Sequence, residues 1–405
     1  MPSAEGPARV RTVALYLAPL KETGGLFQYA RTVAHALATT LPEGSRLVAF
    51  SPPGTEWEAV CASLGIPWTE IGPPSLLPRA LGKVLRTLSG GRVPRSVMSR
   101  LAPLGRALTD AGADVCFYME YEHYGYELAT PSLVAIHDLM YRYESQFAEN
   151  RAYTDAERLF SRLRRGATGL LVDSRVGEEQ LIESFGPEGG RIHILPFIPP
   201  EHIYDPSLLA PDPNLETLLA SVPERFIFYP AQFWEHKNHI GLVDAVMRAA
   251  ETCPDIHLVL VGSPKNHYEA VMRHIDGSGA RSRVSVLGFV SDAVKVALYR
   301  RARVLVLPTF YGPTSIPQLE AMELGCAVAV SRSQAHEEQL GDAAAYFDPR
   351  SVEDMASCLA HVWSDDAYHA ELVRRGSERA AAWGPAQFAA RLWEIVDETA
   401  GRSTR

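Results

Sequence analysis

Residues 304–331 constrain the fold more than any other part of the chain. Their sequence is VLVLPTFYGPTSIPQLEAMELGCAVAVS. An apolar run of strand length, a short loop, a helical segment and a second apolar run follow one another directly, which is typical of a parallel sheet with covering helices. The helix is expected to begin near Thr314 or Ser315, with Pro317 in its first turn, and Gly325 is expected to end it.

This arrangement also predicts a ligand site. A helix that opens at the carboxyl edge of a parallel sheet presents backbone N–H groups and the positive end of its dipole. The backbone of Thr314, Ser315 and Ile316 is therefore a candidate site for a diphosphate. Glu320, about one turn further on, is placed to accept hydrogen bonds from ribose hydroxyls. The same pattern also occurs at α/β turns that bind nothing, since the dipole alone favours a Glu early in a helix.

Alternating strand-like and helix-like segments lie on both sides of a proline-rich stretch. The stretch, residues 196–213, contains six prolines and is typical of an inter-domain linker. Two such sets predict an α/β fold with two Rossmann-like domains, one over 1–200 and one over 201–384. The expected strands are 10–17, 46–51, 115–118, 133–137, 169–173 and 191–195 before or at the start of the linker, and 226–231, 257–262, 284–289 and 304–308 after it.

Composition excludes several classes of function. The chain has 405 residues, enough for two to three domains, and its net charge of −9 disfavours a nucleic-acid partner. Five scattered cysteines without metal-ligand spacing, the lack of a signal-peptide pattern and the lack of a bilayer-length apolar run favour a cytoplasmic protein with reduced thiols. No metal-ligand motif occurs, so no metal or cofactor is expected.

Two further loops at predicted strand ends carry candidate ligand-binding residues. In the segment FYPAQFWEHKNH, residues 228–239, Lys237 stands where a helix begins, and its ammonium could contact phosphate oxygens. Gly24 and Gly25 follow the first strand, where glycines allow close approach of backbone to ligand. A solvated lysine and a plain turn are the alternative interpretations.

Two strand ends carry weaker candidates. His137 and Asp138 follow the predicted strand 133–137, and Asp138 would either orient the imidazole or cap the next segment. Val290 follows the apolar run at 284–289. By themselves these patterns more often mark a structural histidine and an ordinary buried strand.

A local basic segment stands out in this acidic chain. Residues 79–106 hold seven Lys or Arg with no Asp or Glu, and apolar residues are interleaved among them. Such a segment could lie on an anionic membrane surface or hold an anionic acceptor. A solvated face over ordinary helices is the alternative.

The motifs resemble those of the family 4 retaining glycosyltransferases of the GT-B fold. The run 308–330 is similar to the family pattern P-S-x-x-E-G-F-G-L-P-x-x-E-A-M-A-x-G-x-P-V, with matches at Pro308, Ile316, Pro317, Glu320, Ala321, Met322 and Gly325. Lys237 matches the Lys of an Arg-x4-Lys motif, and Ile136-His137-Asp138 matches an I-H-D motif. The chain departs from the family at two positions, because Gly312 replaces the first Glu of a Glu-x7-Glu pair and Gln232 replaces the Arg.

The resemblance implies a fold and a reaction. GT-B proteins have two parallel sheets facing a central cleft, with an acceptor-binding first domain, a donor-binding second domain and a last helix, here 385–405, that crosses back to the first. The expected reaction is retaining transfer of a hexose-type sugar from a UDP-, GDP- or dTDP-linked donor to a hydroxyl of a glycan, glycolipid or natural product, as in polysaccharide biosynthesis.

The resemblance also assigns roles to single residues. His137, Lys237 and Glu320 are the catalytic candidates, and Val290 and Glu320 those for nucleobase and ribose. The candidates for donor and phosphate are Gly24, Gly25, Gln232, Lys237, Thr314, Ser315 and Ile316. Peripheral membrane contact would run through 79–106. A nucleotide-sugar 2-epimerase of the same fold and a non-catalytic sugar-nucleotide binder remain alternatives, and the sugar, nucleobase and acceptor stay open.

Overall fold

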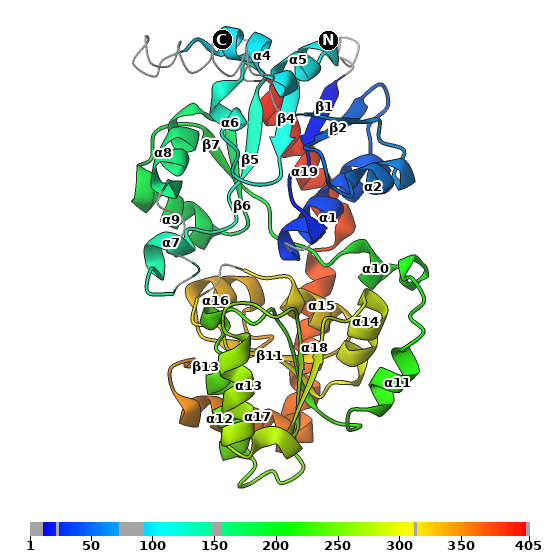
Figure 1. Cartoon of the computed structure of the whole chain (residues 1–405), viewed down its shortest axis with the longest axis vertical. Helices are drawn as coiled ribbons and strands as arrows, with labels where there is room; N and C mark the ends of the chain where they lie inside the picture. The colour runs from blue at the N-terminus through cyan, green and yellow to red at the C-terminus, as the bar shows by residue number, and fades with distance from the viewer. Residues whose placement is uncertain are drawn as a thin grey trace, which may run out of the picture. The chain divides into compact units, whose positions relative to one another are not determined.

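The computed structural model describes residues 11–21, 24–72, 93–147, 149, 155–311 and 314–401, which form two compact units (Figure 1). Unit 1 comprises Met1–His137, Thr154–Pro196 and Pro385–Arg405, and unit 2 comprises Asp138–Tyr153 and Phe197–Gly384. Residues 138–153 therefore group with unit 2, although they lie inside the range predicted for the first domain. The part of the basic segment from 79 to 92 lies outside the described residues.

Unit 1 is built on a seven-stranded parallel sheet with the order β3-β2-β1-β4-β5-β6-β7. Its central strands are continuous buried apolar runs, as expected for a sheet covered on both faces. The strands are β1 Thr12–Tyr16, β2 Arg46–Ser51, β3 Trp68–Glu70, β4 Val115–Tyr118, β5 Ser132–Ala135, β6 Gly169–Val172 and β7 Arg191–Ile194.

The helices of unit 1 include the last helix of the chain. α19 (Pro385–Gly401), red in Figure 1, packs against α1 (Gly25–Thr39), β4 and β5. This helix therefore belongs to unit 1. The other described helices of this unit are α2 Trp57–Ser63, α4 Arg95–Leu101, α5 Pro103–Asp110, α6 Tyr124–Glu127, α8 Ala156–Gly166 and α9 Arg175–Phe185.

Unit 2 is built on a six-stranded parallel sheet with the order β10-β9-β8-β11-β12-β13. The strand order reverses between the neighbours β8 and β11, which makes this pair the topological switch point of the sheet. The strands are β8 Ile227–Pro230, β9 Leu258–Val261, β10 Val284–Gly288, β11 Val304–Leu307, β12 Ala327–Ser331 and β13 Ala345–Phe347.

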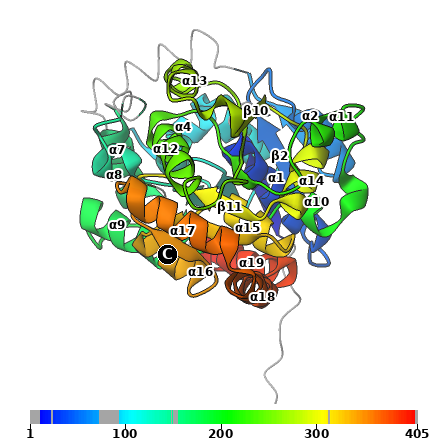
Figure 2. The ribbon, with the colours of Figure 1, turned by 90° about the horizontal axis from the view of Figure 1, so that it is seen from below.

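The helices of unit 2 connect its parallel strands and pack against its sheet. α12 (His239–Ala249) packs against α13 (Tyr268–Gly277) and α17 (Val352–Ser364), and α12 and α17 lie side by side in Figure 2. α14 (Asp292–Arg301) and α15 (Pro317–Glu323) pack against each other. The remaining helices are α7 Met140–Tyr143, α10 Glu201–Tyr204, α11 Leu215–Ala220, α16 Gln334–Leu340 and α18 Asp366–Ala382.

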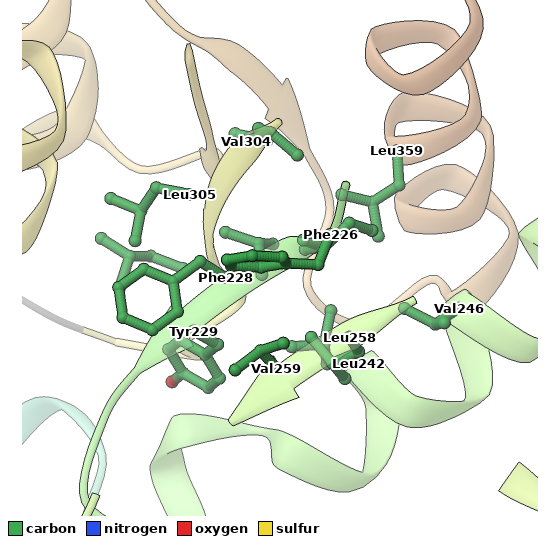
Figure 3. Close-up of a cluster of buried hydrophobic side chains, with 14 of the residues drawn as sticks. Phe226, Phe228, Tyr229, Leu242, Val246, Leu258, Val259, Val304, Leu305 and Leu359 are labelled. Carbon is green, nitrogen blue, oxygen red and sulfur yellow. The ribbon is translucent and has the colours of Figure 1, made fainter. Parts of the chain in front are cut away.

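The core of unit 2 lies between the sheet and these helices. Strand side chains such as Phe228 and Leu258 meet Leu242 of α12 and Leu359 of α17 in one buried cluster (Figure 3). The Phe228 ring contacts the Tyr299 ring edge to face, with centroids 5.0 Å apart. This rigid core holds the carboxyl ends of β8 and β11 in place.

Two general expectations concern cysteines and the membrane. The five cysteines are free thiols, and four of them are buried. In the described part of the chain, no helix has both the length and the apolar character that a bilayer crossing requires.

Candidate active site

The loops that follow β8 and β11 lie together at the switch point of unit 2. The Phe310 N–H donates to the His236 carbonyl at 3.0 Å, and Thr309 Oγ1 donates to the same oxygen at 3.2 Å. Asn238 Nδ2 donates to the Pro308 carbonyl at 3.2 Å. The two loops predicted to share one ligand are therefore hydrogen-bonded to each other at the carboxyl edge of the sheet, where open α/β sheets bind ligands.

Lys237 lies in a 3-10 turn, Glu235–Lys237, and α12 begins two residues later at His239. Asn238 has a left-handed backbone with φ 56°, which ends the turn and redirects the chain into α12. Tyr229 Oη donates to the Lys237 carbonyl at 2.8 Å. Burial lowers the pKa of the Lys237 ammonium, and the negative charges of Asp138 and Glu149 oppose this effect.

Glu149 is a site residue that the sequence analysis missed. Its Oε1 accepts from His236 Nδ1 at 2.6 Å and from the His236 N–H at 3.1 Å, and its Oε2 accepts from Asn266 Nδ2 at 2.8 Å. Burial, and then the charge of Lys237, lower the pKa of His236 to about 4, so its imidazole is neutral. No motif in the sequence marks Glu149, because its partners are 87 and 117 residues away.

The turn before α15 differs from its prediction. The helix begins at Pro317 with Ile316 as its N-cap, and no side chain caps it. The predicted cap Ser315 instead donates its N–H to Gln339 Oε1 at 3.1 Å, while Gln339 Nε2 donates to the Ser315 carbonyl at 3.1 Å. Ser315 N–H is therefore engaged within the protein, and Thr314 beside it is buried. Gly325 ends the segment with φ 76°, as predicted.

Glu320, the candidate for the ribose, lies in a buried ion pair. Its Oε1 is 3.1 Å from Lys295 Nζ, which is also 3.4 Å from Asp292 Oδ1. The side chain of Glu320 is 4% exposed and that of Lys295 is 21% exposed. Lys295 is a second residue that the sequence analysis missed.

The other two candidates of unit 2 follow β8 and β10, which are separated in the sheet by β9. Gln232 Oε1 accepts from Trp234 Nε1 at 3.0 Å. Val290 packs partly against the core after Gly288, which has φ 72°, and Phe289 between them is 77% exposed. The end of β10 therefore presents backbone and one large apolar side chain to solvent.

The candidates of unit 1 lie at the carboxyl ends of β1 and β5. Gly24, with φ 65°, is the N-cap of α1, and Gly25 is the first residue of that helix. His137 donates from Nε2 to the Met119 carbonyl at 2.8 Å, and its ring contacts Tyr29 edge to face. Asp138, the first residue of unit 2, accepts from the Met140 N–H at 2.9 Å.

The described residues contain no cluster of metal-ligating side chains. No set of three or more His, Cys, Asp or Glu within the described ranges is placed to ligate an ion. The expectation of a reaction without metal or cofactor stays a prediction.

Solved structures identify the fold. The chain aligns with the crystal structure of Anabaena Alr3699/HepE in complex with UDP and glucose, with 15% identity and a TM-score of 0.70, over 96% of this chain and 99% of that chain. At this identity the likeness shows the fold, which is the GT-B class of two parallel α/β units. The predicted fold class is confirmed.

The sequence of unit 2 is similar to a known family. Residues 215–381 match the family glycosyl transferases group 1. Two Escherichia coli proteins are similar to this chain over stretches of comparable length. One, "Serotype-specific mannosyltransferase WbdA", is 28% identical over 172 residues, or 42% of this chain and 21% of the relative. The other, "O-antigen chain mannosyltransferase B", is 28% identical over 156 residues, or 38% of this chain and 41% of the relative. The chain thus matches about a fifth of the length of the first relative.

Proposed function

We propose that the protein is a retaining glycosyltransferase that moves a hexose-type sugar from a nucleotide-diphosphate donor to an acceptor hydroxyl. One observation carries this proposal. Half-buried Lys237 lies on a loop that is hydrogen-bonded to the loop after β11, at the switch point of a sheet within residues 215–381, which match the family glycosyl transferases group 1. An ammonium at such an edge is suited to bind a diphosphate.

The difficult step of the reaction is the departure of the diphosphate. The bond between the anomeric carbon and the phosphate oxygen breaks, and negative charge grows on the leaving group. Lys237 would stabilise that charge, and a partly desolvated ammonium does so more effectively than a fully solvated one. The acceptor oxygen forms the new bond to the anomeric carbon, and its proton goes to the departing phosphate.

The proposal assigns the phosphate contacts more narrowly than the sequence did. Since Ser315 donates its N–H to Gln339, the contacts fall to Lys237, Thr314 and Ile316. The Glu320 carboxylate, whose Oε1 pairs with Lys295, is assigned to the ribose hydroxyls. Gly24, Gly25 and His137 stay predictions for the donor or acceptor, and Gln232 and Val290 for the donor phosphate and nucleobase.

The relatives suggest which donors to test first. Two of them are mannosyltransferases by name, and one structural neighbour was solved with UDP and glucose. Mannosyl donors and UDP-glucose therefore lead a thermal-shift panel of UDP-, GDP- and dTDP-sugars. A nucleotide sugar that binds the folded chain raises its melting temperature.

A product assay then separates the possible activities. A glycosyltransferase releases nucleoside diphosphate in proportion to a new glycoside and needs an acceptor. An epimerase consumes donor without acceptor, and a binder shows a thermal shift without overnight turnover. Lys237→Ala should abolish the shift, while Lys237→Arg, which keeps the charge, should retain part of it. Undiminished binding by Lys237→Ala would refute the phosphate assignment.

A further inference from the structure

Residues 138–149 bring aromatic rings onto the two loops of the candidate site. Tyr143 stacks on Tyr311, with centroids 6.1 Å apart and planes 9° apart. Phe147 stacks on Phe310 at 5.7 Å and meets the His236 ring at 6.2 Å. A segment that lies between β5 and α8 in the sequence thus packs on the loops after β8 and β11.

Glu149 adds a buried charge to this contact. Its side chain is 10% exposed and that of His236 is 7% exposed. Although burial favours the protonated form, the hydrogen bonds from His236 and Asn266 lower the pKa of Glu149, so the carboxylate is charged. A neutral imidazole that donates from Nδ1 to a carboxylate has a fixed ring orientation.

His236 is the residue on which the two loops and the 138–149 segment meet. Its ring and N–H bind Glu149, and its carbonyl accepts from the Phe310 N–H and from Thr309 Oγ1. The backbone immediately before Lys237 is therefore held on both sides. A shift of Glu149 would be transmitted directly to the position of the lysine.

The charges around Lys237 come from several elements. The carboxylates are Asp138 and Glu149, and the imidazoles are those of His236, His239 and His336. Burial lowers the pKa of all three histidines, so they are neutral near pH 7. The two carboxylates are then the charged groups that act on Lys237.

We propose that Glu149 is a positioning residue for the donor diphosphate, which fixes the Lys237 turn through His236 and stabilises the Lys237 ammonium with its negative charge. The inference rests on the proposed function and deepens it. It also supplies a physical reason why a chain with Gln232 in place of an arginine can rely on one lysine. The lysine is held in a single position and kept charged by a buried anion.

The first experiment titrates Lys237 itself and needs no donor. The full chain is reductively methylated with ¹³C-formaldehyde, and the Lys237 signal, identified by its loss in Lys237→Arg, is followed by NMR against pH. Glu149→Gln keeps the acceptor oxygen for His236 but removes the charge. The Lys237 midpoint should fall by about one pH unit, as expected for loss of a nearby opposite charge.

A matched control lies in the same segment. Glu144 is a poorly exposed carboxylate that pairs with Arg350 at 3.7 Å and does not touch His236. Glu144→Gln should leave the Lys237 midpoint unchanged. If Glu149→Gln also leaves it unchanged, or if Glu144→Gln lowers it equally, the proposal is overturned.

The second experiment measures nucleotide binding. UDP and GDP are titrated calorimetrically into wild type, Glu149→Gln and His236→Gln from pH 6 to pH 9. Glu149→Gln should weaken binding by up to about tenfold above the lysine midpoint and by less at pH 6, because one pKa unit corresponds to a factor of ten. His236→Gln, which keeps the Glu149 charge, should weaken binding more evenly with pH.

Equal affinity of Glu149→Gln and wild type at every pH would overturn the proposal. If the wild type binds neither nucleotide, the proposed function fails instead, and the NMR titration still decides the role of Glu149.

Discussion

Gln339 pairs with both backbone polar groups of Ser315, accepting from its N–H and donating to its carbonyl, each at 3.1 Å. The Gln339 side chain thereby forms the pair of hydrogen bonds to the Ser315 backbone that a neighbouring β-strand would otherwise form. Gln318, which is fully buried, donates to the same Gln339 oxygen and accepts from Ser315 Oγ. The turn before α15 is thus set by α16 and not by a cap of its own.

Gln339→Ala should loosen this turn. The change leaves buried polar groups of Ser315 and Gln318 without partners, at a cost of roughly 1–3 kcal/mol in the free energy of unfolding. The KM for the donor should rise about tenfold, which corresponds to about 1.4 kcal/mol, with a smaller change in kcat. Gln334→Ala, at an exposed position of the same helix, should change neither. A donor KM equal to that of wild type would contradict this role of Gln339.

Gly262→Ala should displace the loop that carries Gln232. Gly262 has φ 157°, and a Cβ there would lie 2.1 Å from the Ala231 carbonyl oxygen and 3.0 Å from the Gln232 nitrogen. Backbone must move to relieve such a contact, so both thermal stability and nucleotide affinity should fall. At Gly277 no atom lies within 4 Å of an added Cβ, so Gly277→Ala is the matched control. Normal nucleotide binding by Gly262→Ala would show that this loop does not contact the donor.

The Lys295–Glu320 pair predicts a non-additive effect on stability. Lys295→Met leaves a carboxylate with 4% side-chain exposure without its closest cation, which typically costs about 3–5 kcal/mol. Lys295→Met combined with Glu320→Gln removes both charges and should recover part of that loss. Urea unfolding of the two single variants and the double variant measures the coupling. Strict additivity would mean that the pair contributes no interaction of its own.

The same pair predicts how stability depends on alkaline pH. Burial lowers the pKa of Lys295, but the negative charges of Glu320 and Asp292 together raise the pKa by more than burial lowers it, so the net shift is upward. The stabilisation is present below the unfolded-state pKa and is lost as pH rises through the folded-state pKa. Glu320→Gln removes the largest upward contribution, so this variant should lose stability at a lower alkaline pH than wild type.

His239 predicts sensitivity to acid. The imidazole is fully buried and stacks on Phe233 with centroids 4.4 Å apart, and burial lowers its pKa to about 3. Because the unfolded chain binds the proton at about pH 6.5, stability is complete above that pH and declines as pH falls towards 3. His239→Phe should flatten this decline in urea midpoints, whereas His361→Gln, at an exposed site, should not. An unaltered acid slope in His239→Phe would disprove the assignment.

Much of the fold could be predicted because its strands are continuous apolar runs bounded by Gly, Pro or charged residues. The strands at Arg46–Ser51 and Val115–Tyr118 were predicted to the residue. The short edge strands β3 and β13, with three residues each, were missed because so short a run has no measurable period. α16 was missed because Ser333 caps it without a Glu or Gln at the third helical position, where His336 lies.

The sequence predicted those site residues that their own loop or helix end marks, and not those that reach the site from other elements. Lys237 and Glu320 stand at strand and helix ends that the sequence marks. Glu149, Lys295 and Gln339 contact them from other elements, and sequence spacing contains no information about such contacts. The predicted cap at Ser315 failed for the same reason, since its N–H is taken by a side chain 24 residues away.

The interleaving of the chain has a consequence for chimaeras. Unit 2 includes 138–153, so a hybrid enzyme joined only at Pro196 would combine the lysine loop of one parent with the glutamate and aromatic residues of the other. Exchange of donor preference between relatives should therefore require transplanting 138–153 together with 197–384. A hybrid that leaves this short piece behind would inherit a mismatched anion beside its lysine.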